Sequence, residues 1–153
     1  MKADSISFFV ARRMIAASVL DRRQLAYAEV HHLPLRLSRA CESLSYFVHW
    51  ILGQLEVPIA VIVENDDFGD ATQELRNELL AVLAKECVPV WRVQEQDLLN
   101  AYAIPACKTR RELEQIALSF WPFLEGSRQM VATLPALAGL YVHVEKLLTP
   151  TDT

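Results

Sequence analysis

A run of acidic residues at the end of an apolar segment is the part of the sequence best suited to chemistry. Glu64, Asp66 and Asp67, with Asn65 among them, directly follow the apolar segment Val57–Val63. Carboxylate oxygens are hard ligands that suit divalent cations, and open α/β sheets build their sites at strand ends. The run predicts a residual metal site or a partner contact. The alternative is a solvated loop whose acids favour the N-terminus of the next helix.

Basic residues form three short clusters. The doublets Arg12-Arg13 and Arg22-Arg23 flank one predicted strand, so they should lie at opposite ends of the sheet and not form one patch. A third cluster opens a predicted helix, where a helix N-terminus could contact a phosphate group. The candidate nucleic-acid contacts are Lys108, Arg110, Arg111, Arg12 and Arg13. For each cluster the alternative is an ordinary solvated surface charge.

The histidines and cysteines lack the spacings of a metal site or of a nucleophile with its base. His31 and His32 are adjacent on a predicted strand, so their side chains point to opposite faces and cannot chelate one ion together. We expect His31 and Glu29 on the exposed side of that strand. Three widely spaced cysteines give no disulfide framework, which indicates a reduced, cytoplasmic protein.

Composition limits the classes of partner. The chain has 153 residues, 52% of them hydrophobic, and a net charge of −4. We expect one domain over residues 1–148 and a frayed tail over 149–153. The acidic balance argues against broad binding of nucleic acid. It favours a protein partner or self-association, with structured nucleic acid bound by a local basic patch as the alternative. No segment reaches the roughly 18 apolar residues of a membrane span, and no glycine-rich loop indicates a small-molecule cofactor.

The pattern of apolar residues predicts the elements that position these groups. Three strands joined by tight turns should form an antiparallel meander: Ser5–Val10, Met14–Leu20 and Leu25–Leu33.

The rest of the chain alternates helices with strands. The predicted elements are a helix over Arg39–Leu55 capped by Ser38, the strand Val57–Val63, a helix capped by Thr72, the strand Val88–Val93, and helices over Arg110–Leu124 and Met130–Leu148. Right-handed crossovers then give a five-stranded mixed sheet of order 3-2-1-4-5 with helices on both faces.

This order of elements resembles the ribonuclease H-like α/β fold, and within it the RuvC-type Holliday-junction resolvases. The most specific local similarity is the segment Leu98–Pro122. In the family a small residue and a lysine open a helix that ends near an apolar-Trp-Pro sequence. The matching residues here are Ala106, Lys108 and Trp121-Pro122.

The resemblance implies hydrolysis of phosphodiesters by two metal ions, which requires three or four converging carboxylates. Glu64 matches the family's acid at the end of the fourth strand. The first-strand acid is missing, because Val10, Ala11 or Arg12 stands at that height. In the last helix, Pro135 stands where the family has its aspartate.

We therefore expect a non-catalytic ribonuclease H-like domain that acts by binding, with Glu64 as a residual acid and no cofactor. The alternative is a divergent nuclease that holds Mg²⁺ or Mn²⁺ with Glu64, Asp66 and Asp67. The two hypotheses predict different surroundings for Glu64. The nuclease needs at least three clustered carboxylates, whereas the binding domain should leave Glu64 isolated from other acids, or paired with Arg12 or Lys108.

Overall fold

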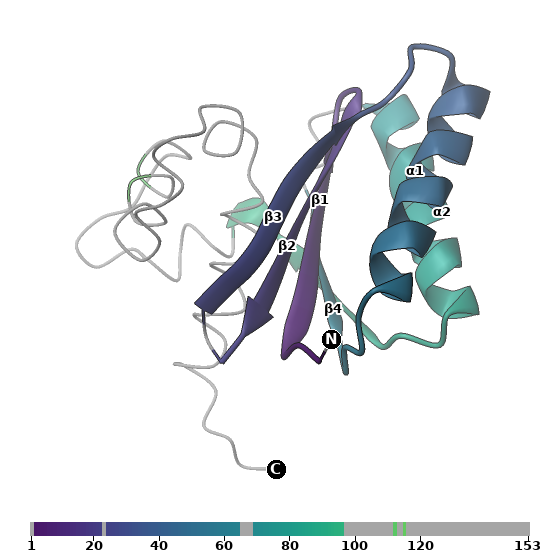
Figure 1. Cartoon of the computed structure of the whole chain (residues 1–153). Coiled ribbons are helices and arrows are strands. Elements are labelled where there is room, and N and C mark those ends of the chain that lie inside the picture. Colours follow the sequence, from purple (N-terminus) through teal and green to yellow (C-terminus); the bar gives the residue numbers. More distant parts are fainter. Residues whose placement is uncertain (1, 23, 65–68, 97–111, 113–114, 116–153) are drawn as a thin grey trace.

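A mixed sheet with a layer of helices forms the described part of the molecule (Figure 1). The computed structural model describes residues 2–22, 24–64, 69–96, 112 and 115. Seven elements follow one another in it: β1 (Ser5–Ala11), β2 (Met14–Asp21), β3 (Gln24–His32), α1 (Leu37–Gly53), β4 (Ala60–Glu64), α2 (Asp70–Lys85) and β5 (Val90–Gln94). The strand order β3-β2-β1-β4-β5 confirms the predicted topology.

Tight turns create the antiparallel half of the sheet. Ser5 pairs with Leu20 and Ala11 with Met14, so only two residues connect β1 to β2. Arg13 and Arg22 lie in the two turns with φ of 58° and 54°. This left-handed conformation matches the twist of a short hairpin loop. The register therefore places the two turns at opposite ends of β2, as the sequence predicts for Arg12-Arg13 and Arg22.

Parallel pairing creates the other half of the sheet. β1 pairs with β4, and β4 with β5, both in parallel. All residues of β1 and β4 are buried, as expected for central strands without a solvent face. The carboxyl ends of three strands consequently meet at one edge of the sheet, at Ala11, Glu64 and Gln94.

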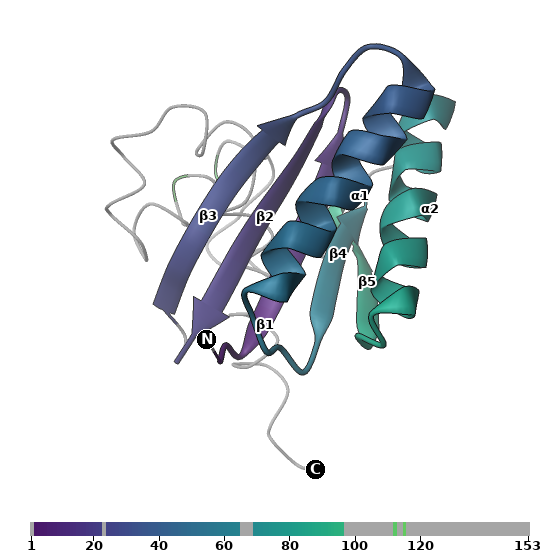
Figure 2. The same cartoon turned by 45° about the vertical axis from the view of Figure 1, so that its right-hand side comes forward.

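The two helices cover the same face of the sheet and pack against each other (Figure 2). Their apolar stripes meet the sheet residues that point to this face, which form one core cluster with them. That cluster includes Ile6, Phe8, Leu44, Ile62 and Leu79. The helices predicted over 110–124 and 130–148 lie outside the described residues, so a helical cover on the second face stays a prediction. No helix in the described part is long and apolar enough to cross a membrane.

Both predicted helix caps are wrong. α1 has Arg36 at its N-cap and begins at Leu37, so Ser38 lies inside the first turn. α2 has Gly69 at its N-cap, with φ of 93°, and Thr72 is a buried residue within the helix. Neither N-cap makes a side-chain hydrogen bond. Cap-forming residue types are a weak signal when packing against the sheet decides where a helix begins.

The burial of α1 side chains predicts which substitutions in this helix lower stability. Leu44 is fully buried in α1, whereas Tyr46 on the same helix is 77% exposed. Leu44→Ala should lower the free energy of unfolding by about 2–5 kcal/mol, because it leaves a cavity under the helix. Tyr46→Ala should change it by about 0.5 kcal/mol or less. Urea denaturation followed by circular dichroism measures both. Similar losses for the two variants would contradict this packing.

Candidate functional site

Glu64 is a buried carboxylate that accepts hydrogen bonds from two side chains and forms an ion pair with a third. It is the last residue of β4, and only 5% of its side chain is exposed. Arg92 Nε donates to Glu64 Oε1 at 2.5 Å, and Gln94 Nε2 donates to Oε2 at 3.4 Å. Arg76 Nη1 lies 3.9 Å from Oε2 in an ion pair. The site is therefore a carboxylate between two guanidinium groups and an amide.

Strand pairing and the start of α2 bring these groups together. Ile62 pairs with Arg92 and Glu64 with Gln94, so these side chains share one face of the sheet. Arg76 lies on the face of α2 that packs toward the sheet, where only 7% of its side chain is exposed. Arg92 is 54% exposed and approaches from the solvent side. One cation thus reaches Glu64 from within the core and the other from the edge.

The electrostatics of this arrangement disfavour a divalent cation. Two guanidinium groups lie against the one carboxylate, and their positive charge disfavours a metal ion at its oxygen atoms. No group of three His, Cys, Asp or Glu side chains among the described residues could hold a metal. Asp66 and Asp67 lie outside the described residues, so their part in a metal site stays untested.

Arg12, one of the two cations predicted to pair with Glu64, does not pair with it. Within the described residues, the ion-pair partners of Glu64 are Arg76 and Arg92, and not Arg12. Lys108, the other predicted partner, lies outside the described residues together with Arg110 and Arg111. One signal in the sequence could have found Arg76. It occupies a position within the apolar stripe of α2, where a charged residue needs a buried partner.

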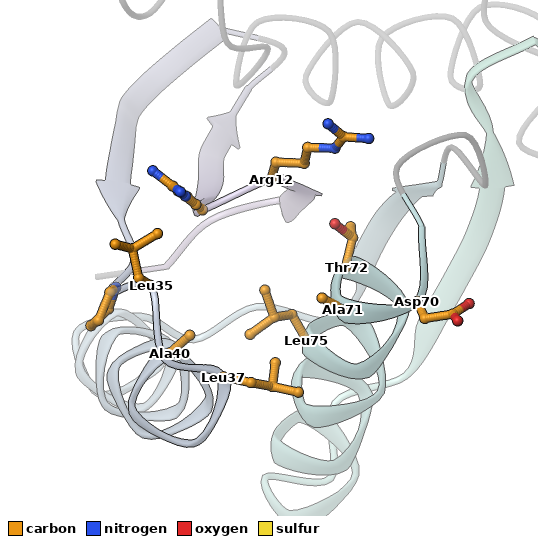
Figure 3. A pocket seen from close by; sticks show the side chains of 10 residues that line it. Arg12, Leu35, Leu37, Ala40, Asp70, Ala71, Thr72 and Leu75 are labelled. Atoms are coloured by element: carbon orange, nitrogen blue, oxygen red, sulfur yellow. The ribbon is translucent and has the colours of Figure 1, made fainter.

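Arg12 and Arg13 lie apart from Glu64 in a different surrounding. Both are exposed in the β1–β2 turn and line a cavity of about 350 Å³. The cavity continues to the first turns of α1 and α2 (Figure 3). The structure therefore brings Arg12 and Arg13 to the two helix N-termini.

His31 lies on the opposite face of β3 from the one predicted. It pairs with Ile15, which points toward α1, and its ring stacks on Phe47 with centroids 4.8 Å apart. Its Nε2 shares a hydrogen bond of 2.9 Å with Ser43 Oγ. Glu29 lies on the same face and accepts a hydrogen bond from Tyr27. The exposed side predicted for His31 and Glu29 is wrong, because the edge strand turns its polar residues toward the flank of the helix.

Burial shifts the pKa values of His31 and Tyr27. Desolvation by burial lowers the pKa of His31, the carboxylate of Glu29 opposes this shift in part, and the charge of His32 adds a smaller lowering. Desolvation and the hydrogen bond to Glu29 raise the pKa of Tyr27. His31 is thus favoured in its neutral form, in agreement with a structural role in which it packs on Phe47.

Comparison with known proteins extends this description of the fold. No family model matches the chain, and no curated protein matches it in sequence. Solved structures do match. A Thermus thermophilus RuvC structure superimposes with a TM-score of 0.77 at 12% identity, covering 95% of this chain and 96% of that one. T. thermophilus RuvC in complex with a Holliday junction substrate matches with a TM-score of 0.74 at 12% identity, covering 94% of this chain and 96% of that one.

These matches define the class of fold. The chain has the RuvC-like variant of the ribonuclease H-like α/β fold, as the order of its elements indicates. An identity of 12% establishes the fold and carries no residue roles. The chemistry must therefore be argued from the surroundings of Glu64.

The buried ion pair predicts a large effect of Glu64 on stability. Glu64→Gln should lower the free energy of unfolding by about 3 kcal/mol, because it removes the carboxylate charge that is paired with the buried Arg76. The double variant Glu64→Gln with Arg76→Met should recover part of this loss. Glu74→Gln, on the exposed side of α2, serves as the matched control. Chemical denaturation measures all three. An equal effect at Glu64 and Glu74 would contradict the pairing.

The lowered pKa of His31 leads us to expect that the stability of the fold depends on pH. Its pKa in the folded state lies below the value of about 6.5 that it has when unfolded. Below about pH 6.5 the unfolded chain therefore binds more protons, and stability should fall as the pH falls through this window.

His31→Gln should lose this part of the dependence, whereas His32→Gln, on the opposite face, should keep it. Thermal melting at a series of pH values between neutral and mildly acidic measures the effect. Parallel profiles for wild type and His31→Gln would exclude His31 as the titrating group.

Proposed function

We propose that this chain is a non-catalytic RuvC-like domain that acts by binding a partner. One observation carries the proposal, namely that Arg76 and Arg92 neutralise Glu64. A catalytic carboxylate must leave oxygen atoms available to a metal ion. Here Arg92 and Gln94 donate to both oxygens of Glu64, and Arg76 adds a second positive charge.

Residues of the first strand support the same conclusion. Metal catalysis of phosphodiester hydrolysis places two cations between carboxylates from different elements. β1 lies directly beside β4, and Phe9 pairs with Val63, so the end of β1 is one of the two neighbouring strand ends that could supply a second acid. The residues there are Val10, Ala11 and Arg12, none of which can bind a cation. A two-metal centre would therefore have to form without an acid from β1.

The class of partner follows from charge. The net charge of −4 disfavours extended contact with a nucleic acid and favours a protein partner or self-association. A RuvC of the same fold is known in complex with a Holliday junction substrate. Structured nucleic acid is consequently the second candidate partner, and the exposed Arg12 and Arg13 are the described residues that would contact it.

The competing function is a divergent nuclease that uses Glu64 with Asp66 or Asp67 and a divalent cation. It would need Arg76 and Arg92 to release Glu64 when the metal binds. Such an exchange would leave the buried guanidinium of Arg76 without this carboxylate, which costs free energy. The ion pair therefore favours the non-catalytic function.

Calorimetric titration with Mn²⁺ tests the proposal. The wild-type chain should release no heat of binding beyond that of Glu64→Gln, and neither should cleave a four-way DNA junction in the presence of Mn²⁺. An active RuvC serves as the positive control for both measurements. Binding of Mn²⁺ that Glu64→Gln abolishes, or metal-dependent cleavage by the wild type, would establish the nuclease instead.

A further inference from the structure

Both apolar and basic side chains line the cavity beside Arg12 and Arg13. Its volume is about 350 Å³, within the range of sites that enclose a small ligand or a peptide side chain. Four parts of the chain surround it, namely the β1–β2 turn, the segment between β3 and α1, and the first turns of both helices (Figure 3). It is therefore built by the fold and not by one loop.

Apolar side chains form most of its lining. The apolar residues are Pro34, Leu35, Leu37, Ala40, Ala71 and Leu75. Leu35 belongs to this apolar lining and is nevertheless 75% exposed to solvent. An exposed apolar surface rimmed by polar residues gains free energy when a partner covers it. Burial of an apolar group here would thus be favourable.

Positive charge surrounds this apolar lining. Arg12 and Arg13 are exposed at its margin, and no described residue forms an ion pair with either of them. Arg36 and Arg39 are exposed next to lining residues in the chain. Among the described residues, the one acid that lines the cavity is Asp70, and its carboxylate points away from the cavity (Figure 3).

The N-termini of both helices add to this positive potential. α1 begins at Leu37 and α2 at Asp70, and both first turns line the cavity. A helix N-terminus carries a partial positive charge from its free amide groups. The cavity thus combines apolar walls with a cationic margin, on a chain whose net charge is negative.

We propose that this cavity binds an acidic segment of a protein partner, with an apolar side chain in the cavity and carboxylates on Arg12 and Arg13. The proposal deepens the binding function proposed above, on which it rests. Guanidinium groups pair with carboxylates in a fork geometry. A peptide of alternating acidic and apolar residues supplies both kinds of contact at once.

The lining argues against a nucleic-acid backbone as the occupant. A phosphodiester backbone would satisfy Arg12 and Arg13 but would place no apolar group against Leu35, Leu37 and Leu75. The exposed Leu35 would then stay in contact with water, and the favourable burial would be lost. The apolar walls therefore select a peptide over nucleic acid.

Fluorescence anisotropy with a short labelled peptide of alternating aspartate and leucine tests the proposal. The variants are Arg12→Gln with Arg13→Gln, and separately Leu35→Ser, which removes the exposed apolar side chain. Arg22→Gln is the matched control, because Arg22 is an exposed turn arginine with nearly the same φ as Arg13, at the other end of β2. Peptides with asparagine for aspartate, or serine for leucine, separate the two kinds of contact. A labelled oligothymidylate is the nucleic-acid probe.

We expect the double arginine variant to bind the peptide about tenfold more weakly than the wild type does. Its affinity should also depend less on the salt concentration. Leu35→Ser should also weaken binding, and Arg22→Gln should not. Both altered peptides should bind more weakly than the parent. No binding by the wild type, or equal binding by the double arginine variant, would overturn the proposal. Tighter binding of the oligothymidylate, lost in the double variant, would overturn it in favour of nucleic acid.

Sedimentation of the free chain tests a second copy as the occupant. The wild type should sediment without self-association that depends on Arg12 and Arg13. A dimer that the double arginine variant dissociates would overturn the proposal in favour of self-association. Calorimetry with Mn²⁺ is independent of these measurements, so failure of the peptide to bind leaves the non-catalytic function standing, and binding of Mn²⁺ refutes that function alone.

Discussion

A buried carboxylate must be compensated, and this requirement decides the character of the site at Glu64. An ionised group cannot remain inside a protein without a counter-charge or a metal ion. Arg76 supplies the counter-charge from α2 and Arg92 supplies it from β5. The end of β4 is therefore tied to two other elements by charge as well as by packing. The same donors that stabilise Glu64 occupy the positions from which a metal ion would bind it.

Arg76 and Arg92 place positive charge at the edge of the sheet where the carboxyl ends of the parallel strands meet. In a metal-dependent enzyme this edge concentrates negative charge, which cations then neutralise. Here Glu64 is paired with Arg76 and Arg92, and Arg12 and Arg13 add exposed positive charge at the end of β1. A positive edge on an acidic protein attracts anionic groups selectively to that edge. The proposed binding of an acidic segment agrees with the exposed positive charge of Arg12 and Arg13 at this edge.

The sequence was sufficient for the fold but not for the surroundings of Glu64. Uniformly apolar segments and tight turns identify the strands, and handed crossovers then determine the order β3-β2-β1-β4-β5. The contacts of Glu64 depend on the register between β4 and β5, which places Arg92 and Gln94 on its face. Nothing local in the sequence fixes that register. The faces of β3 were misjudged for the same reason, because an edge strand has polar residues on both sides.

The fold can persist without a metal centre because the two have separate physical origins. The core cluster between the sheet and the two helices consists of apolar side chains such as Phe8, Leu44 and Leu79, far more numerous than the groups around Glu64. Burial of these side chains does not depend on a bound ion. Because Arg76 is buried beside Glu64, removal of the acid would take away one of the partners of this cation, so stability by itself favours a glutamate there. An acid at this strand end is therefore evidence of metal catalysis only when its neighbours are acids as well.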